Sequence, residues 1–164
     1  MAELSPEQLA KLTVLVVDPN KFTRGIVCDL LRQLGIRAVR QAESGAAALD
    51  EIRTFHPSVV LSEREVPDMD GLAITRWIRT HADSPNSRTP VIMVTFRTTK
   101  QELFEAREAG VTEFIVKPVT GQAIMLRLRA ALLDPREFVR SETFVGPSRR
   151  RRPDEDFKGQ ERRR

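Results

Sequence analysis

The sequence predicts an α/β fold in which helices cover both faces of a five-stranded, doubly wound parallel sheet. Short β-branched or apolar runs alternate with stretches whose apolar residues recur every three or four positions. Five such strand and helix pairs follow one another along the chain. Several of the runs are apolar at every position, which is typical of parallel strands that are buried on both faces.

The chain begins with a short helix signal, followed by the first strand. Ser5 precedes a proline, and Gln8 follows three residues later, which is the pattern of a capped helix start. Residues 13–17 (TVLVV) form a buried strand. Asn20 then begins a helix, whose apolar positions recur at helical spacing until Gly35 ends it.

The same alternation continues to residue 133. Further strands are expected at residues 36–41, 58–62, 90–95 and 113–116. The intervening helices are expected after Ser44 and over residues 72–81, 100–109 and 122–133. In an open parallel sheet, functional groups gather at the C-terminal ends of the strands, near the point where the strand order reverses.

Positive charge is concentrated at the C-terminal end. The chain carries a net charge of +4, and residues 144–164 contain eight Lys or Arg against four Asp or Glu. Residues 1–143 are therefore neutral. The basic charge is confined to the C-terminal segment, which can bind anions. The single cysteine excludes an internal disulfide, and no apolar run approaches the roughly 20 residues that cross a bilayer. We expect a cytoplasmic protein without membrane insertion.

Apolar periodicity ends at Pro135. The residues that follow hold too few apolar side chains to offset the entropy cost of ordering them, so this extension is expected to be disordered without a ligand. The predicted divisions are an N-terminal leader with a short helix (1–11), a body (12–133), a linker (134–143) and an arginine-rich, ligand-binding tail (144–164).

Polar residues that could form a site follow the predicted strands. They are Asp18, Glu63 with the segment Pro67-Asp68-Met69-Asp70-Gly71 behind it, Thr95, and Lys117-Pro118. Over residues 12–133 this order resembles the receiver domain of bacterial response regulators, the CheY type of chemotaxis in particular. The resemblance implies the flavodoxin-like receiver fold.

The same resemblance implies roles for these positions. In that family a pair of acids holds Mg²⁺, an aspartate accepts a phosphoryl group, and a threonine and a lysine bind the phosphoryl oxygens. An aromatic residue near the fifth strand changes rotamer on activation, and Phe114 occupies that position.

This sequence keeps only part of that set. Pro19 replaces the second metal-binding acid, Glu63 stands in place of the aspartate, and Phe96 stands where a small residue admits the phosphodonor. The extra methylene of Glu63 places its carboxylate in the space of the phosphoryl group and Mg²⁺. We therefore expect a degenerate, non-enzymatic pocket without a metal ion, in which Glu63 reaches Lys117. The pocket residues are Asp18, Glu63, Thr95 and Lys117.

The tail contains an internal repeat. Residues 144–151 (FVGPSRRR) and 157–164 (FKGQERRR) share Phe, Gly and three Arg at an offset of thirteen residues. Such a repeat suggests a ligand with two equivalent halves. A two-fold cyclic dinucleotide is such a ligand, because it presents two guanines and two phosphodiesters.

The residue types of the tail suit that ligand. Arginine pairs with guanine O6 and N7 and stacks on bases, and a carboxylate accepts from the opposite guanine edge. Arg151-Arg152-Pro153-Asp154 has the R-x-x-D form of the product-inhibition sites of diguanylate cyclases. The phenylalanines can stack on bases, and the glycines allow close approach of the backbone. The predicted site for cyclic di-GMP (c-di-GMP) comprises Phe144, Gly146, Arg149, Arg150, Arg151, Arg152, Asp154, Asp156, Phe157, Gly159, Arg162, Arg163 and Arg164.

An arginine repeat on a receiver-like body with an altered pocket resembles the CheY-like c-di-GMP effectors (Cle proteins). These carry an arginine-rich C-terminal extension and act at the flagellar motor switch. The resemblance implies a non-catalytic adaptor, in which c-di-GMP orders the tail and the complex docks on the flagellar switch protein. It also implies recruitment to the flagellated pole or motor.

Two alternatives stay open. One is a receiver with residual phosphoacceptor function, which would autophosphorylate from a small donor. The other is an electrostatic tether to nucleic acid or to an anionic membrane, which would bind any polyanion with a steep dependence on salt. The acids between the arginine clusters argue against nucleic acid, because they weaken attraction to a continuous polyanion.

Overall fold

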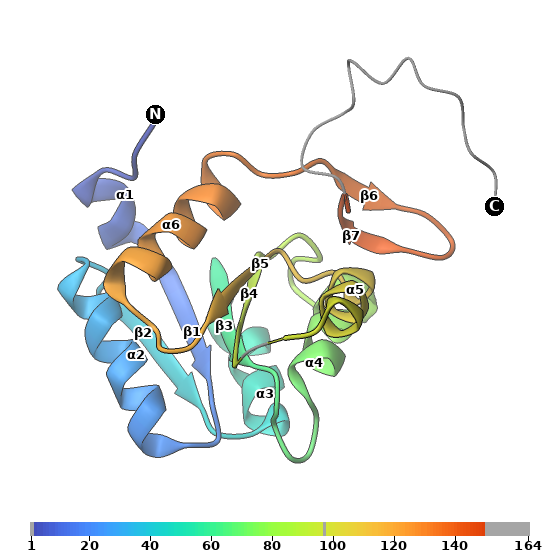
Figure 1. The fold of residues 1–164 in the computed structure, drawn as a ribbon, viewed down its shortest axis with the longest axis horizontal. Coiled ribbons are helices and arrows are strands. Elements are labelled where there is room, and N and C mark those ends of the chain that lie inside the picture. Colours follow the sequence, from blue (N-terminus) through green and yellow to red (C-terminus); the bar gives the residue numbers. More distant parts are fainter. Residues whose placement is uncertain (1, 97, 150–164) are drawn as a thin grey trace.

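The computed structural model describes residues 2–96 and 98–149 (Figure 1). The helices are α1 (Pro6–Lys11), α2 (Lys21–Gln33), α3 (Gly45–Phe55), α4 (Gly71–Thr80), α5 (Lys100–Ala109) and α6 (Gly121–Leu132). The strands are β1 (Thr13–Val17), β2 (Ala38–Ala42), β3 (Val59–Glu63), β4 (Val91–Thr95), β5 (Glu113–Val116), β6 (Phe138–Arg140) and β7 (Val145–Pro147). Every predicted element of the body is present, with small shifts at the ends.

The first five strands form one parallel sheet in the order β2-β1-β3-β4-β5. The chain therefore winds outward from β1 in both directions, so the strand order reverses between β1 and β3. A crevice at the C-terminal ends of these two strands is the expected place for a site in such a sheet. The predicted doubly wound fold is confirmed.

Helices cover both faces of this sheet (Figure 1). Val14 and Val16 of β1 point to one face and pack with α2 and α6, and Leu9 of α1 joins the same apolar cluster. Leu15 and Val17 point to the opposite face and pack with α3 and α4. This alternation along one strand explains why β1 is apolar at each of its core positions. No helix among the described residues is long and apolar enough to span a bilayer.

The extension begins with an ordered hairpin. Strands β6 and β7 pair antiparallel, with Phe138 opposite Pro147 and Arg140 opposite Val145. The ring of Phe144, just before β7, is only 6% exposed. The prediction that the extension is disordered from Pro135 onward is therefore wrong for the hairpin. Its paired backbone and its contacts with the body stabilise it, although its sequence has no apolar periodicity. The predicted boundary between linker and tail falls inside it.

Two glycines bring the hairpin and the body into backbone contact. Gly110 ends α5 with a left-handed φ of 97°, a conformation that favours glycine. A Cβ atom built on Gly146 of β7 would lie 2.9 Å from the Cα of Gly110, closer than real Cβ contacts allow. The hairpin therefore packs directly against the backbone at the end of α5.

A buried arginine lies beneath this contact. The side chain of Arg79 in α4 is 1% exposed and donates to the carbonyl oxygens of Gly110 (3.0 and 2.9 Å) and Thr89 (2.6 Å). The ring of Phe138 in β6 lies 5.7 Å from its guanidinium carbon. Burial, together with the charge of Arg136, lowers the pKa of Arg79 to about 10, so it stays charged at neutral pH. Arg79 thus connects α4, the loop before β4 and the hairpin.

Candidate functional site

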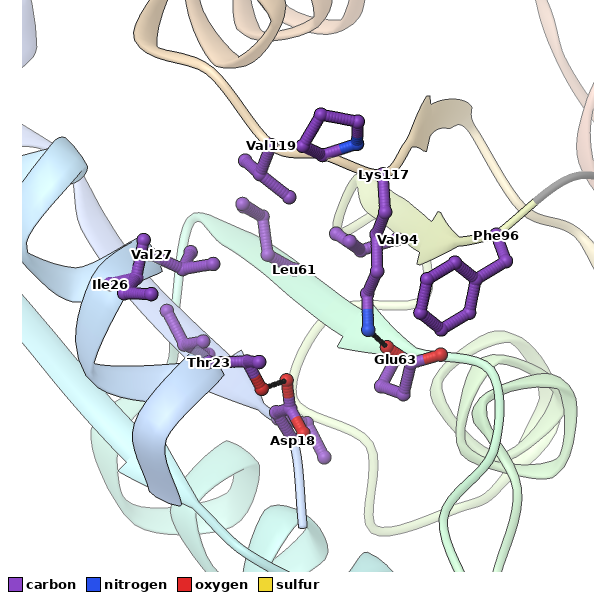
Figure 2. Close-up of a pocket in the computed structure, with 13 residues that line it drawn as sticks. Asp18, Thr23, Ile26, Val27, Leu61, Glu63, Val94, Phe96, Lys117 and Val119 are labelled. Carbon is purple, nitrogen blue, oxygen red and sulfur yellow. Dashed lines mark hydrogen bonds and ion pairs between the residues drawn. The ribbon is translucent and has the colours of Figure 1, made fainter. Parts of the chain in front are cut away.

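A cavity of about 390 Å³ opens at the C-terminal ends of the central strands (Figure 2). Asp18, Glu63 and Lys117 reach it from the ends of β1, β3 and β5, so the structure brings these three predicted residues together. Thr23 adds a hydroxyl from α2, and the remaining wall is apolar. The apolar lining residues are Val16, Val17, Ile26, Val27, Leu61, Val94, Phe96, Pro118 and Val119.

The carboxylate of Asp18 is 7% exposed and is bound through both oxygens. Oδ1 accepts from the backbone N–H of Asn20 (2.8 Å), and Oδ2 accepts from the Thr23 hydroxyl (2.6 Å), a contact drawn in Figure 2. Behind it, the Arg24 guanidinium donates to the backbone carbonyl of Asp18 (2.8 Å) and to Gln41 (3.0 Å). The start of α2 therefore fixes the orientation of the Asp18 carboxylate at the wall of the cavity.

Glu63 forms an ion pair with Lys117, as predicted (Figure 2). The two side chains are only 10% and 17% exposed, and Glu63 Oε1 also accepts from the backbone N–H of Arg64 (3.2 Å). Low solvent access strengthens the attraction between the two opposite charges, so each group is held in place by the other.

Phe96 and Thr95 flank the ion pair from the end of β4. The ring of Phe96 is 70% exposed and lies 4.8 Å from the ammonium nitrogen of Lys117, a cation–π contact. The carbonyl oxygen of Thr95 accepts from the backbone N–H of Lys117 (2.8 Å). Thr95 thus lies at the predicted strand end, but it does not line the cavity.

The residues at this site do not fit a magnesium ion. Both oxygens of Asp18 already accept hydrogen bonds, Pro19 offers no side-chain oxygen, and the carboxylate of Glu63 is paired with Lys117. Within the described ranges, no three His, Cys, Asp or Glu side chains are grouped to hold a metal ion. Mg²⁺ prefers several oxygen ligands in near-octahedral geometry, which this arrangement does not supply.

Thr23 and Arg24 are site residues that sequence reasoning missed. They begin α2 and look like ordinary first-turn residues in the sequence. Their contacts with Asp18 arise because Asn20 caps the helix and turns its first residues back toward the end of β1. No sequence signal distinguishes them.

The predicted switch aromatic and the first residues of the predicted tail site lie away from this cavity. Phe114 in β5 packs on the cluster of Leu72, Met93, Ala106, Ala109 and Val111. The Arg149 guanidinium lies 4.9 Å from the ring of Phe144 and forms an ion pair of 2.6 Å with Glu108.

The remaining predicted tail residues lie outside the described ranges. They are Arg150, Arg151, Arg152, Asp154, Asp156, Phe157, Gly159, Arg162, Arg163 and Arg164.

Comparison with known proteins identifies the family of the chain. Residues 14–129 match the response regulator receiver domain family. Chemotaxis protein CheY-3 of Vibrio cholerae is 32% identical over 117 residues, which cover 71% of this chain and 88% of that protein. Chemotaxis protein CheY of Pseudomonas aeruginosa is 32% identical over 113 residues, covering 69% and 90%.

Solved structures show the same fold. Chemotaxis protein CheY4 of Vibrio cholerae superimposes with a TM-score of 0.68 at 26% identity, covering 74% of this chain and 98% of that one. The receiver domain of the histidine kinase CKI1 from Arabidopsis thaliana, solved with Mg²⁺ and BeF₃⁻, gives 0.65 at 29% identity, covering 75% and 92%. The chain belongs to the response regulator receiver family.

Proposed function

We propose that this receiver is a non-catalytic signalling adaptor that binds c-di-GMP through its arginine-rich tail and docks on a protein partner, the flagellar motor switch. Its place of action is the cytoplasm, at the flagellated pole or motor. The observation that carries the proposal is the ion pair between Glu63 and Lys117. Because this pair takes the phosphoryl position, phosphorylation does not regulate the protein in this proposal. The arginine repeat of the tail binds the signalling ligand instead.

The described part of the tail supports this proposal with one refinement. Phe144 is buried and Gly146 packs against Gly110, so neither is exposed to a base in this structure. Instead, the ring of Phe144 supports the guanidinium of Arg149. In the refined proposal the hairpin positions Arg149, and the arginines that follow it complete the nucleotide contacts.

The edge of the sheet at β5 offers a surface for the protein partner. Phe104 of α5, Val116 of β5 and Leu126 of α6 are 55%, 51% and 49% exposed, respectively. Strand β5 is the edge strand of the sheet, and α5 and α6 are the helices before and after it in the chain. Exposed apolar side chains on adjacent elements are typical of protein-binding surfaces. The chemotaxis relatives make a motor component the natural candidate.

Calorimetric titration with c-di-GMP tests the proposal, with GMP and cyclic di-AMP as controls. The protein should be the full chain and a version ending at Arg149, because a cut within the hairpin would also remove the buried Phe144. A full-length variant with glutamine at residues 150–152 and 162–164 keeps the length and removes the charge. We expect guanine-selective binding by the full chain and a large loss in both altered proteins.

Equal binding by the shortened and full-length proteins would refute the role of the tail. Binding of the full chain to heparin and RNA as strongly as to c-di-GMP, with a steep fall in affinity as salt rises, would instead support the electrostatic tether. Partner docking is tested separately, by pull-down of the motor switch protein with Phe104→Asp or Leu126→Asp.

A further inference from the structure

A second cavity, of about 300 Å³, lies at the N-terminal end of β5, whereas Glu63 lies at the C-terminal end of β3. Four arginines line it, and they come from four different segments: Arg107 of α5, Arg127 of α6, Arg136 of the connection to β6, and Arg149 after β7. Half-buried Phe114 supplies an apolar wall. The pairing of the sheet strands does not require four arginines to lie together at this cavity.

The arginines of this basic cavity are held in different ways. Arg127 forms an ion pair of 3.4 Å with the buried Glu113, and Arg149 pairs with Glu108 at 2.6 Å. Arg136 donates to the carbonyl oxygens of Ser148 (2.9 Å) and Thr112. These contacts fix the guanidinium groups in place before any ligand arrives, and preorganised groups lose less entropy on binding.

Arg107 differs from the other three. Its side chain is exposed, and it makes no hydrogen bond or ion pair with any residue that the structure describes. Among the residues that the structure describes, two of the four arginines are paired with carboxylates, Arg127 with Glu113 and Arg149 with Glu108. Positive charge is therefore in excess at this place, although the body as a whole is neutral. Such a local excess attracts anions and is stabilised when one binds.

We infer that the basic cavity is the receptor for one guanosine phosphate half of c-di-GMP, so that the nucleotide binds between the body and the extension rather than to the tail alone. The phosphodiester would lie among Arg107, Arg127 and Arg149, and the base would pack on Phe114. The inference rests on the proposed function and deepens it by assigning residues of the body to the same ligand.

Size and position support this assignment. A cavity of about 300 Å³ lies at the lower end of the range for small-molecule sites, which suits half of a dinucleotide. Arg149 is both a wall of the cavity and the first arginine of the repeat. The hairpin thus places this one arginine of the repeat at the cavity.

Charge reversal at Arg107 tests the inference in the full-length protein. Arg107→Glu should weaken c-di-GMP binding by about tenfold or more, because a charge-assisted contact becomes a repulsion. Arg37→Glu is the matched control, because Arg37 is also exposed and lies before β2, at the other edge of the sheet. It changes the net charge equally and should keep affinity within about twofold, since distant surface charges are screened by salt.

A second probe, GMP, reports on the cavity directly. In NMR titrations of the full chain, GMP should shift the amide signals of Phe114 and Arg107, and Arg107→Ala should abolish the shift at Phe114. Thermal unfolding of each variant checks that the fold is intact, which we expect because the Arg107 side chain supports no described contact.

The possible results distinguish failure of the inference from failure of the proposed function. If the wild-type chain binds c-di-GMP, and Arg107→Glu binds equally well with no GMP shift at Phe114, the inference is overturned and the tail alone is the receptor. If the wild-type chain does not bind c-di-GMP, the proposed function fails and the inference fails with it.

Discussion

The ammonium group of Lys117 and the carboxylate of Glu63 form an ion pair beside the cavity at the C-terminal ends of β3 and β5. The pair is shielded by the Phe96 ring on one side and by an apolar cavity wall on the other.

The first prediction concerns phosphorylation. With Mg²⁺ and acetyl phosphate, the wild-type protein should keep its mass, because Asp18 is already bound and Lys117 is paired. The double variant Pro19→Asp/Glu63→Asp should gain the mass of one phosphoryl group. It adds the second metal-binding acid beside Asp18 and shortens the nucleophile by one methylene. Pro19→Asp/Glu63→Ala is the control without a nucleophile. An alkali-labile phosphoryl adduct on the wild type would contradict the prediction.

The second prediction concerns the stability of the same pair. Lys117→Met leaves the nearly buried Glu63 carboxylate without its cation and should lower the free energy of unfolding by about 1–3 kcal/mol. The exposed pair of Arg32 and Asp29, at 3.3 Å, offers a control. Arg32→Met should change stability by about 0.5 kcal/mol or less. Urea denaturation measures the free energy of unfolding of both variants. An equal decrease in the two would show that burial does not increase the contribution of the Glu63–Lys117 pair to stability.

The third prediction concerns the buried ring in the hairpin. Phe144→Ala should destabilise the hairpin by about 2 kcal/mol or more, because it opens a cavity and removes the support of Arg149. Amide hydrogen exchange in β6 and β7 should accelerate, and c-di-GMP binding should weaken with it. The control is Phe104→Ala, whose ring is 55% exposed. Weaker nucleotide binding with unchanged exchange would instead indicate that Phe144 contacts a base directly.

The fourth prediction concerns pH. Asp68 accepts from the backbone N–H groups of Gly45 (2.8 Å) and Ala46 (3.0 Å) at the start of α3, and these hydrogen bonds lower its pKa. An acid with a lowered folded-state pKa stabilises the fold above its ordinary value of about 3.9. That contribution disappears as the pH falls through the lower, folded-state value.

Asp68→Asn should therefore destabilise the protein at pH 7 and matter less at strongly acidic pH. Ser44→Ala is the matched control, because it removes a neutral cap of the same helix. It should cost about 1 kcal/mol at either pH. Guanidinium unfolding at the two pH values distinguishes the two patterns, and a pH-independent loss in Asp68→Asn would refute the electrostatic explanation.

Most of the body could be predicted from the sequence because its signals are local. Ser5, Asn20 and Ser44 cap helices as expected, and each capping oxygen accepts from a backbone N–H within three residues. The parallel direction of the strands also follows, since strands that are joined by helical crossovers run parallel. The ion pair between Glu63 and Lys117 was predictable because the family pattern brings both positions to one place.

The hairpin and the basic cavity could not be predicted in this way. Strands β6 and β7 have three residues each, too few to show a periodicity. They are held by contacts with Gly110 and Arg79, which are distant in the sequence. The arginines of the cavity come from four separate segments, and each one alone looks like an ordinary surface charge. Only the folded chain brings them together.

The close approach of Gly146 to Gly110 has a consequence for related chains. Because a Cβ atom on Gly146 would lie 2.9 Å from the Cα of Gly110, we expect an extension that docks in this manner to need glycine at that position. A relative with a larger residue at either position would have to carry its arginines on an undocked extension. We therefore expect the two glycines to distinguish docked from undocked basic extensions, which solved structures of related chains with and without these glycines would check.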